Sequence, residues 1–251
     1  MNREDHIRKW LAEQEIAQIK GWDFSHIDVY HTQDELPWDY KIEILNYLKP
    51  EHKILDLDTG GGEFLLSLQH PYVNTAATEN YPPNVALCSQ TLLPLGIDFK
   101  QADAKGELPY ADESFDIVLD RHGDFNAKEI CRVLKPGGIF ITQQVGAEND
   151  RELVEALLGD IPLSFPDQYL PLTKAAFESA GFTVLDTKEA YPMIRFTDIG
   201  ALVWFARIIS WEFVGFAVEK CLPQLFALQE KLEKDGEVNA KTHRYMLIGR
   251  K

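Results

Sequence analysis

The feature that most limits what this chain can fold into is an alternation of two patterns between residues 53 and 145. Short apolar runs predict strands near 53–58, 74–79, 97–103, 115–120 and 138–145, and helical periodicity predicts helices near 63–69, 83–93 and 126–134. Strands that alternate with helices form βαβ units, whose parallel strands share one sheet with helices on both faces. We therefore predict an α/β fold with a doubly wound, mostly parallel sheet.

Further elements are predicted on both sides of this alternation. Helices are expected near 3–20, 38–48, 149–158, 173–180, 198–213 and 219–234, and strands near 182–191 and 243–249. Gly21 and Gly181 are placed to end helices. Because no repeat, low-complexity segment or clean linker interrupts the chain, we predict a single domain over 1–251. Its parts are an N-terminal helical cap at 1–50, a core at 51–191, a helical insertion at 192–241 and a last strand at 242–251.

The ends of the predicted helix near 126–134 have distinct signals. Asn126 and Glu129 have the spacing of a capping box, in which each side chain accepts from the other residue's backbone N–H. The run Lys135-Pro136-Gly137-Gly138 supplies a cation, a helix breaker and flexible turn residues. The helix boundaries are therefore predicted firmly.

The charge balance argues against a nucleic-acid partner. The chain has 25 Lys and Arg against 40 Asp and Glu, which gives a formal net charge of −15, and a phosphate backbone is repelled by such a surface. The first ten residues carry charges of both signs and no apolar run, so we expect neither a secretory signal nor a transit peptide and predict a cytoplasmic protein. Cys88, Cys131 and Cys221 lack the spacing of a disulfide framework or a metal site, so we expect reduced thiols and no metal.

One segment has the length and apolar character of a bilayer span. It covers Ile199 to Val218. Arg207 lies near its middle and Glu212 follows, and each would cost about 2.5–3.5 kcal/mol at the bilayer centre. We therefore interpret the segment as a buried helix and expect no membrane partner.

A glycine turn follows the first strand of the alternation. The run from Ile54 to Leu66 is an apolar strand, three glycines at 60–62 and the opening of a helix. In open α/β sheets, ligands bind at the carboxyl ends of the strands, where glycines let backbone approach a ligand and a helix offers free N–H groups. A nicotinamide or flavin fingerprint would require glycine at position 65, which is Leu65. A different cofactor site is predicted, although a tight turn could need the same glycines.

The turn resembles motif I, D-x-G-x-G-x-G, of the class I S-adenosylmethionine-dependent methyltransferases. Asp56, Gly60 and Gly62 stand in register with that motif. The resemblance continues along the chain with Glu79-Asn80, Gln101-Ala102-Asp103-Ala104, the Leu108-Pro109-Tyr110 to Val118 run, Arg132 to Gly138, and the final Met246 to Lys251. It implies a sheet of seven strands, six parallel and one antiparallel, and S-adenosyl-L-methionine as cofactor.

The resemblance also implies which residues contact that cofactor. The turn would contribute Asp56, Asp58, Thr59, Gly60, Gly61 and Gly62, and the other strand ends would contribute Glu79, Asn80, Asp103, Ala104 and Asp120. Glu79 lies where a carboxylate can accept from both ribose hydroxyls. Asp103 would accept from the adenine amine, with the backbone N–H of Ala104 meeting the ring.

Position 58 departs from the family pattern, which has glycine there. Asp58 places a second carboxylate beside Asp56, and Asp tolerates left-handed turn dihedrals better than most residues. One interpretation is an extra partner for the sulfonium or α-amino group of the cofactor. The other is a side chain turned into solvent, and a damaged site is a further possibility.

The acceptor side of this fold borders the end of the fourth strand of the alternation. That segment reads Leu119 to Phe125 and lacks the [DNS]-P-P-[YFW] motif of the amino-methylases of nucleic acids. His122 is our candidate catalytic base, held by Asp120 or Asp124. A plainer possibility is that His122 and Arg121 only form hydrogen bonds within the loop.

Aromatic residues outside the core have two interpretations. Trp22, Phe24, Trp38, Phe196, Trp204, Phe205, Trp211, Phe213 and Phe216 could line a lid, although helix-spaced aromatics more often pack in a core. A lid would favour a small, apolar or aromatic acceptor. The predicted function is therefore methyl transfer from S-adenosylmethionine to such a molecule by in-line displacement. The alternatives are a non-catalytic cofactor-binding or scaffold protein and an RNA or protein methyltransferase. The pattern gives no oligomeric state.

Overall fold

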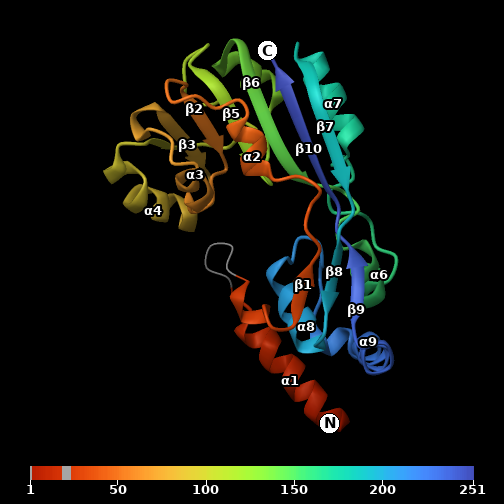
Figure 1. Ribbon diagram of the computed structural model, residues 1–251. Helices are drawn as coiled ribbons and strands as arrows, with labels where there is room; N and C mark the ends of the chain where they lie inside the picture. The colour runs from red at the N-terminus through yellow and green to blue at the C-terminus, as the bar shows by residue number, and fades with distance from the viewer. Residues whose placement is uncertain (1, 19–23) are drawn as a thin grey trace. The chain divides into compact units, whose positions relative to one another are not determined.

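A computed structural model describes residues 2–18 and 24–251, and these residues form two compact units (Figure 1). The first, which we call the large-sheet unit, comprises Pro37–Gly146, Asp167–Ala190 and Arg244–Lys251. The second, the small-sheet unit, comprises Met1–Leu36, Ala147–Pro166 and Tyr191–His243. The single domain expected over 1–251 stays a prediction. The predicted cap at 1–50 is shared between the two units, because residues 37–50 belong to the large-sheet unit.

The large-sheet unit contains a seven-stranded sheet in the order β4-β3-β2-β5-β6-β10-β7 (Figure 1). Its strands are β2 (Ile54–Leu57), β3 (Thr75–Glu79), β4 (Asp98–Gln101), β5 (Phe115–Arg121), β6 (Leu134–Val145), β7 (Thr183–Ala190) and β10 (Arg244–Arg250). The pairs among β2 to β6 are parallel, and β10 pairs antiparallel with both β6 and β7. Six strands therefore run one way and β10 the other, which confirms the predicted fold class and the direction of the last strand.

Helices connect these strands, as the alternation predicts. They are α2 (Tyr40–Leu45), α3 (Glu63–Ser67), α4 (Pro82–Thr91), α5 (Ala127–Val133) and α7 (Leu170–Ser179), with short 3-10 turns at Tyr72–Asn74 and Leu93–Leu95. Because side chains alternate along a strand, β2 presents Leu55 and Leu57 to one core and Asp56 to the opposite face. That core also contains Phe140 and Phe177 from β6 and α7.

The start of α5 confirms half of the predicted capping box. The side chain of Asn126 accepts from the backbone N–H groups of Lys128 and Glu129, at 3.1 and 3.4 Å. The Glu129 carboxylate does not return to the backbone of Asn126. It accepts from the Leu108 N–H and forms an ion pair with Arg132, because a fixed guanidinium offers more donors than one amide.

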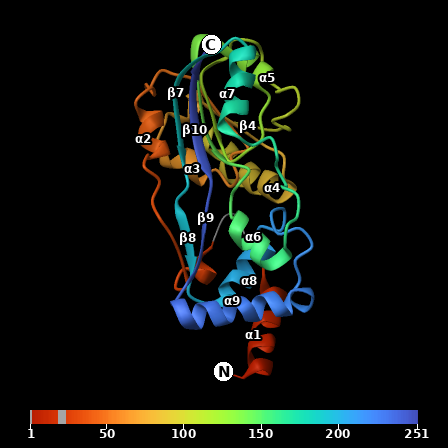
Figure 2. The ribbon, with the colours of Figure 1, turned by 90° about the vertical axis from the view of Figure 1, so that its right-hand side faces the viewer.

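The small-sheet unit contains three strands that the sequence analysis missed. β1 (His31–Gln33), β8 (Met193–Phe196) and β9 (Val238–Lys241) pair antiparallel in the order β1-β8-β9. The helices of this unit are α1 (Arg3–Ile16), α6 (Arg151–Leu158), α8 (Ile199–Ile208) and α9 (Leu222–Asp235), with 3-10 turns at Ser25–Ile27 and Val218–Lys220 (Figure 2). The insertion predicted to be helical therefore begins and ends with strands. Gly21, predicted to end the first helix, lies outside the described residues.

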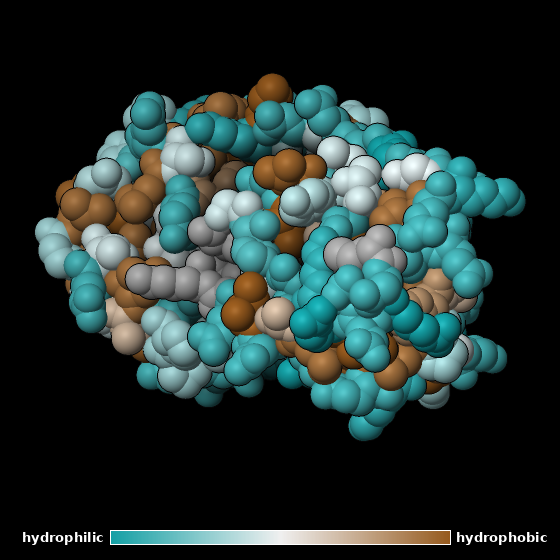
Figure 3. All heavy atoms as spheres, turned by 90° about the horizontal axis from the view of Figure 1, so that it is seen from below, coloured by the Kyte–Doolittle hydropathy of each residue, from teal (hydrophilic) through white to brown (hydrophobic). Residues whose placement is uncertain are grey.

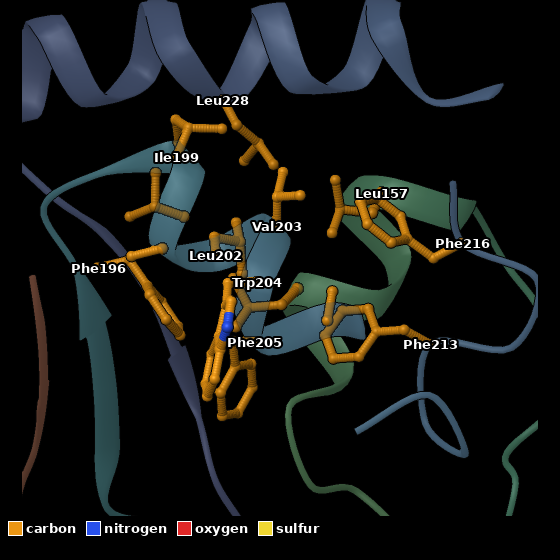
Figure 4. Close-up of a cluster of buried hydrophobic side chains, with 14 of the residues drawn as sticks. Leu157, Phe196, Ile199, Leu202, Val203, Trp204, Phe205, Phe213, Phe216 and Leu228 are labelled. Carbon is orange, nitrogen blue, oxygen red and sulfur yellow. The ribbon is translucent and has the colours of Figure 1, made fainter. Parts of the chain in front are cut away.

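The aromatic residues proposed for a lid are mostly core residues. Phe196, Trp204, Phe205, Phe213 and Phe216 are buried and pack with Leu157, Ile199, Leu202, Val203 and Leu228 (Figure 4). Phe24 packs against Trp204 and Phe205. Trp211 is 42% exposed, and Trp22 lies outside the described residues. The core interpretation is thus confirmed for the buried residues.

The segment checked as a bilayer span folds as a short buried helix followed by turns. α8 covers Ile199–Ile208 and nearly all of its residues are buried. Arg207 donates from Nη1 to the carbonyl of Phe216, at 3.1 Å. Within 2–18 and 24–251, every helix is too short or too polar to cross a bilayer.

The surface carries isolated hydrophobic side chains among hydrophilic ones. Figure 3 shows one face, on which brown hydrophobic residues are interspersed with teal hydrophilic ones. Most exposed among the large hydrophobic residues are Val73 at 85% and Val29 at 84%. The cysteines are free, as predicted, with Cys88 and Cys221 buried and Cys131 half-buried.

Candidate cofactor and acceptor site

The glycine turn between β2 and α3 has a backbone that few residues other than glycine adopt. Asp58, Gly60 and Gly62 have positive φ values of 46°, 65° and 85°, which lie in the left-handed region. A Cβ on Gly62 would also lie 2.8 Å from a methyl group of Leu92. The turn therefore needs glycine at position 62 for both its dihedral angles and its packing, and a Cβ on Gly61 would meet only the flexible Glu63 side chain.

Glu79, at the end of β3, ties this turn to the neighbouring loop. Its Oε2 accepts from the backbone N–H of Gly60, at 2.9 Å. Its Oε1 accepts from the backbone N–H groups of Asn80 and Tyr81, at 2.8 and 2.9 Å, and Asn84 Nδ2 lies 3.3 Å from Oε2. Glu79 is only 5% exposed. The buried carboxylate therefore fixes the geometry of two loops at once.

These contacts sharpen the role that the resemblance implies for Glu79. A carboxylate offers about four acceptor positions, and four protein donors already approach Glu79. A ribose hydroxyl would have to replace one of them. The contact with Asn84 is the longest of the four, so Asn84 is the donor that a ligand would displace at the smallest cost.

Asp56 is buried beneath the turn. The Thr59 hydroxyl donates to its Oδ2, at 2.6 Å, and the backbone N–H of Thr59 donates to the carbonyl of Thr78, at 2.9 Å. Burial raises the pKa of Asp56 to about 7, although the Thr59 hydroxyl and the Arg121 charge act in the opposite direction. Asp56 therefore exchanges a proton near neutral pH in the free protein.

Asp58 is half-buried and is not turned into solvent. Its Oδ2 accepts from the backbone N–H of Asp124, at 3.0 Å. Burial raises its pKa to about 6, this hydrogen bond opposes the rise, and the Glu79 charge adds to it. The residue that replaces the family's glycine thus bridges the turn and the loop after β5.

Asp120, at the end of β5, faces the same loop. Its Oδ1 accepts from the Gln144 side-chain amide, the Thr142 hydroxyl at 3.4 Å and the Gly123 N–H at 3.3 Å. Its Oδ2 is buried and has no hydrogen-bond partner among the described residues. A Cβ on Gly123 would lie 2.9 Å from Asp58 Oδ2 and 3.1 Å from Asp120 Oδ2. Both oxygens therefore border one point, where a cationic ligand group would find two carboxylates.

The remaining predicted cofactor residues lie at the ends of β3 and β4. Asp103 and Asn80 are exposed, and Ala104 is buried. Asp103 Oδ1 accepts from the backbone N–H of Lys105, at 2.9 Å. Because Glu79 pairs with Gln101 across the sheet, these residues lie on neighbouring strand ends. The structure thus gathers the predicted set at the carboxyl edge of β2, β3, β4 and β5.

His122 lies on this edge but not in the predicted arrangement. We expected Asp120 or Asp124 to hold the imidazole. Instead, the Gln143 side chain lies 3.2 Å from its Nε2, and burial with the charges of Arg244 and Arg121 lowers the pKa of His122. Asp120 and Asp124 do not bind the ring because their oxygens meet other donors, Gln144 and Lys105 among them. A histidine with a lowered pKa is a weaker base than an ordinary one.

Sequence reasoning did not single out several residues that shape this edge. Gln143 and Gln144 on β6 bind His122 and Asp120, and Asn84 on α4 approaches Glu79. Two consecutive glutamines in an otherwise apolar strand are a usable signal, because buried polar side chains need partners. Nothing in the sequence marks Asn84, which is one of many polar residues on a helix surface.

The residues at this edge fit an S-adenosylmethionine-type cofactor. The buried, unpartnered Asp120 Oδ2 and the neighbouring Asp58 suit the cationic methionine end. The glycine turn leaves room for backbone contact, and the exposed Asp103 follows the end of β4, where the resemblance implies the adenine contact. His/Cys/Asp/Glu groups that could hold a metal ion are absent from 2–18 and 24–251.

Known proteins resemble this chain in sequence and in fold. Residues 55–142 match the family described as a methyltransferase domain. The phthiotriol/phenolphthiotriol dimycocerosates methyltransferase of Mycobacterium tuberculosis is 34% identical over 149 residues, which cover 55% of this chain and 51% of the relative. The fatty-acid O-methyltransferase of Mycolicibacterium smegmatis is 30% identical over 116 residues, which cover 43% of this chain and 42% of the relative.

The fold also has a counterpart among solved structures. The crystal structure of the YcgJ protein of Bacillus subtilis superimposes with a TM-score of 0.59 at 20% identity, covering 84% of this chain and 97% of that one. The chain thus resembles methyltransferases in the segment 55–142 and shares its fold with this solved structure. It spans about half the length of the curated relatives it matches, so the relatives' whole activities are not transferred with the family.

Proposed function

We propose that this protein binds S-adenosyl-L-methionine and transfers its methyl group to a small, apolar, lipid-like molecule. Two similar proteins bear the names of methyltransferases for a mycobacterial lipid and for fatty acids. The observation that carries the proposal is the carboxyl edge of the large sheet, where Glu79 orders the glycine turn and the Asp120 Oδ2 has no partner among the described residues.

In this proposal, the chain's own residues bind the cofactor and orient the acceptor. S-adenosylmethionine supplies a methyl group on a cationic sulfur. Asp58 and Asp120 would hold the cationic end, Glu79 the ribose after displacing Asn84, and Asp103 with Ala104 the adenine. In-line displacement needs the acceptor atom positioned and freed of water more than it needs acid–base groups. His122 would lie beside the acceptor rather than act as a strong base.

The test is calorimetry with S-adenosylmethionine and S-adenosylhomocysteine on the whole chain, followed by methyl transfer from labelled cofactor to a lipid extract. We expect one site per chain and a labelled, organic-soluble product. Failure of both ligands to bind at millimolar concentration would overturn the proposal. Binding without any product would favour the alternative of a non-catalytic cofactor-binding protein.

A further inference from the structure

A chain of hydrogen bonds in the large-sheet unit fixes the protonation state of His122. The indole N–H of Trp38 donates to Gln143 Oε1, at 2.8 Å. Both residues are buried, with exposed fractions of 8% and 7%. An indole nitrogen is a donor only, so it identifies the Gln143 atom that faces it as the oxygen. The amide nitrogen of Gln143 must then point to the other side, toward His122.

The side-chain amide of Gln143 determines which nitrogen of the His122 ring carries the proton. Gln143 Nε2 lies 3.2 Å from His122 Nε2, and an amide nitrogen can only donate. The imidazole Nε2 therefore accepts, and the neutral ring carries its proton on Nδ1. None of the described residues accepts a hydrogen bond from this Nδ1–H. The Nε2 side of the ring is packed against Gln143, where desolvation lowers its pKa, but the residue as a whole keeps an exposed surface. The loop after β5 thus presents a hydrogen-bond donor, not a free base.

Positive charge surrounds this donor. Arg121, the preceding residue, places its guanidinium 4.3 Å from the ring centre of Phe64. Arg244 begins β10 opposite Val145, two residues along β6 from Gln143, and both cations act electrostatically on His122. Two of the nearby acids have other cationic partners: Asp124 forms an ion pair with Lys105, at 2.8 Å, and Asp120 would face the cationic end of the cofactor.

We propose that His122 Nδ1–H, flanked by Arg121 and Arg244, forms a subsite for a carboxylate group, and that the methyl acceptor is an apolar carboxylic acid. A carboxylate is the oxygen nucleophile that such a donor and two cations bind without having to deprotonate it. The inference rests on the proposed function. Trp38 and Gln143 are positioning residues, because they act on the ligand through His122.

The reaction balances without a base. The carboxylate oxygen forms a bond to the methyl carbon while the bond between that carbon and sulfur breaks, and the electron pair of the broken bond stays on sulfur. An anion and a cation become a neutral ester and a neutral thioether, and no proton is released. A carboxylic acid is already ionised at pH 7, which agrees with the lowered pKa of His122. An alcohol or amine acceptor would release one proton.

The first experiment measures the binding of octanoate by calorimetry to the whole protein saturated with S-adenosylhomocysteine. His122→Asp keeps a residue that tolerates the left-handed backbone found here, at φ 64°, and replaces the donor by an anion. We expect octanoate to bind at least about tenfold more weakly to this variant, as for loss of one hydrogen bond to a charged group. His122→Asn, which keeps a donor, is the matched control and should lose less.

The second experiment separates the acceptor's carboxylate from the methionine carboxylate of the cofactor. If the subsite serves the acceptor, His122→Asp leaves the affinity for S-adenosylhomocysteine within about twofold. A tenfold loss of that affinity, with octanoate binding unchanged, would assign the subsite to the cofactor and overturn the proposal. A wild type that binds neither cofactor form would refute the proposed function instead, and octanoate titration without cofactor would still test the subsite.

Two further measurements test the chemistry and the positioning. With octanoate and 1-octanol as paired acceptors, we expect methyl ester formation without proton release into a weak indicator buffer. Methylation of the alcohol alone, with one proton released, would overturn the inference.

Nitrogen-15 NMR should place the His122 proton on Nδ1 in the wild type. Gln143→Glu should shift the proton to Nε2, because a carboxylate beside Nε2 accepts from it.

Discussion

The two units of this protein bury carboxylates to different extents. The core of the small-sheet unit consists of aliphatic and aromatic side chains such as Trp204 and Phe205, with few polar groups inside (Figure 4). The large-sheet unit buries three carboxylates, those of Asp56, Glu79 and Asp120, and half-buries that of Asp58, whereas the small-sheet unit buries the carboxylate of Asp150. Burying a carboxylate costs stability unless donors compensate it. We infer from this difference that the small-sheet unit contributes mainly to stability and that the large-sheet unit holds the candidate site.

The largest effect is expected from a cavity in the small-sheet unit. Trp204 is 3% exposed and packs against Phe24 and His26. Trp204→Ala should lower the free energy of unfolding by about 3–5 kcal/mol, measured by urea denaturation. Trp211→Ala, at a residue 42% exposed, is the control and should cost well under half as much. If only the large-sheet unit binds the cofactor, the folded Trp204→Ala variant should keep the wild-type cofactor affinity. A loss of cofactor affinity in this variant would contradict that assignment.

Glu79→Ala should produce the next largest effect, on both stability and binding. The change removes the acceptor of three backbone N–H groups, each worth about 1.5–3 kcal/mol when the acceptor is charged. Urea denaturation should show that the free energy of unfolding falls by at least the contribution of one such bond. Calorimetry should show at least tenfold weaker cofactor binding. Asn84→Ala removes the 3.3 Å contact alone and should leave stability nearly unchanged. Equal cofactor affinity in wild type and Glu79→Ala would show that Glu79 does not bind the ribose of the cofactor.

The buried carboxylate of Asp56 should make the stability of the large-sheet unit depend on pH. The pKa of Asp56 is raised to about 7 in the folded chain, against about 3.9 in an unfolded chain. The folded state therefore holds a proton that the unfolded state has lost, so stability falls as pH rises from about 4 to 7. The slope is up to about 1.4 kcal/mol per pH unit for one such group.

Urea denaturation between pH 4.5 and 8 measures this slope. Asp56→Asn should flatten it, because an amide does not titrate, and a buried Asn can still accept from Thr59. Asp235→Asn, at an exposed residue of the small-sheet unit, is the control. The same pH dependence in wild type and Asp56→Asn would contradict the raised pKa of Asp56.

The smallest expected effect concerns Asp58, where the chain departs from the methyltransferase motif that its glycine turn resembles. Asp58→Gly removes one of the two carboxylates beside Gly123 and relieves a left-handed backbone, at φ 46°, which glycine adopts freely. Calorimetry should show that S-adenosylmethionine loses more affinity than S-adenosylhomocysteine, because only the former carries a sulfonium charge. Equal losses would mean that Asp58 merely shapes the loop through its bond to Asp124. Tighter binding to the variant would show that Asp58 damages the site.

The sequence by itself determined the large sheet and the position of its site. Strand runs such as 54–57 and 115–121 are continuous and apolar, and the glycine turn marks the edge where ligands bind, because these signals are local. Even the antiparallel last strand followed from the resemblance and is confirmed by its pairing with β6 and β7.

Only the tertiary structure decided the features that depend on distant partners. The strands β1, β8 and β9 are three or four residues long. β1 pairs with β8 across more than 150 positions of sequence, as His31 with Phe196, and β8 pairs with the distant β9, as Phe196 with Val238, so no local pattern predicts them. The proton on His122 is likewise set by Trp38 and Gln143, which lie 105 residues apart. A residue's type gives the hydrogen bonds it can make, but the partners it meets come from packing, and these partners determine its protonation state and its role.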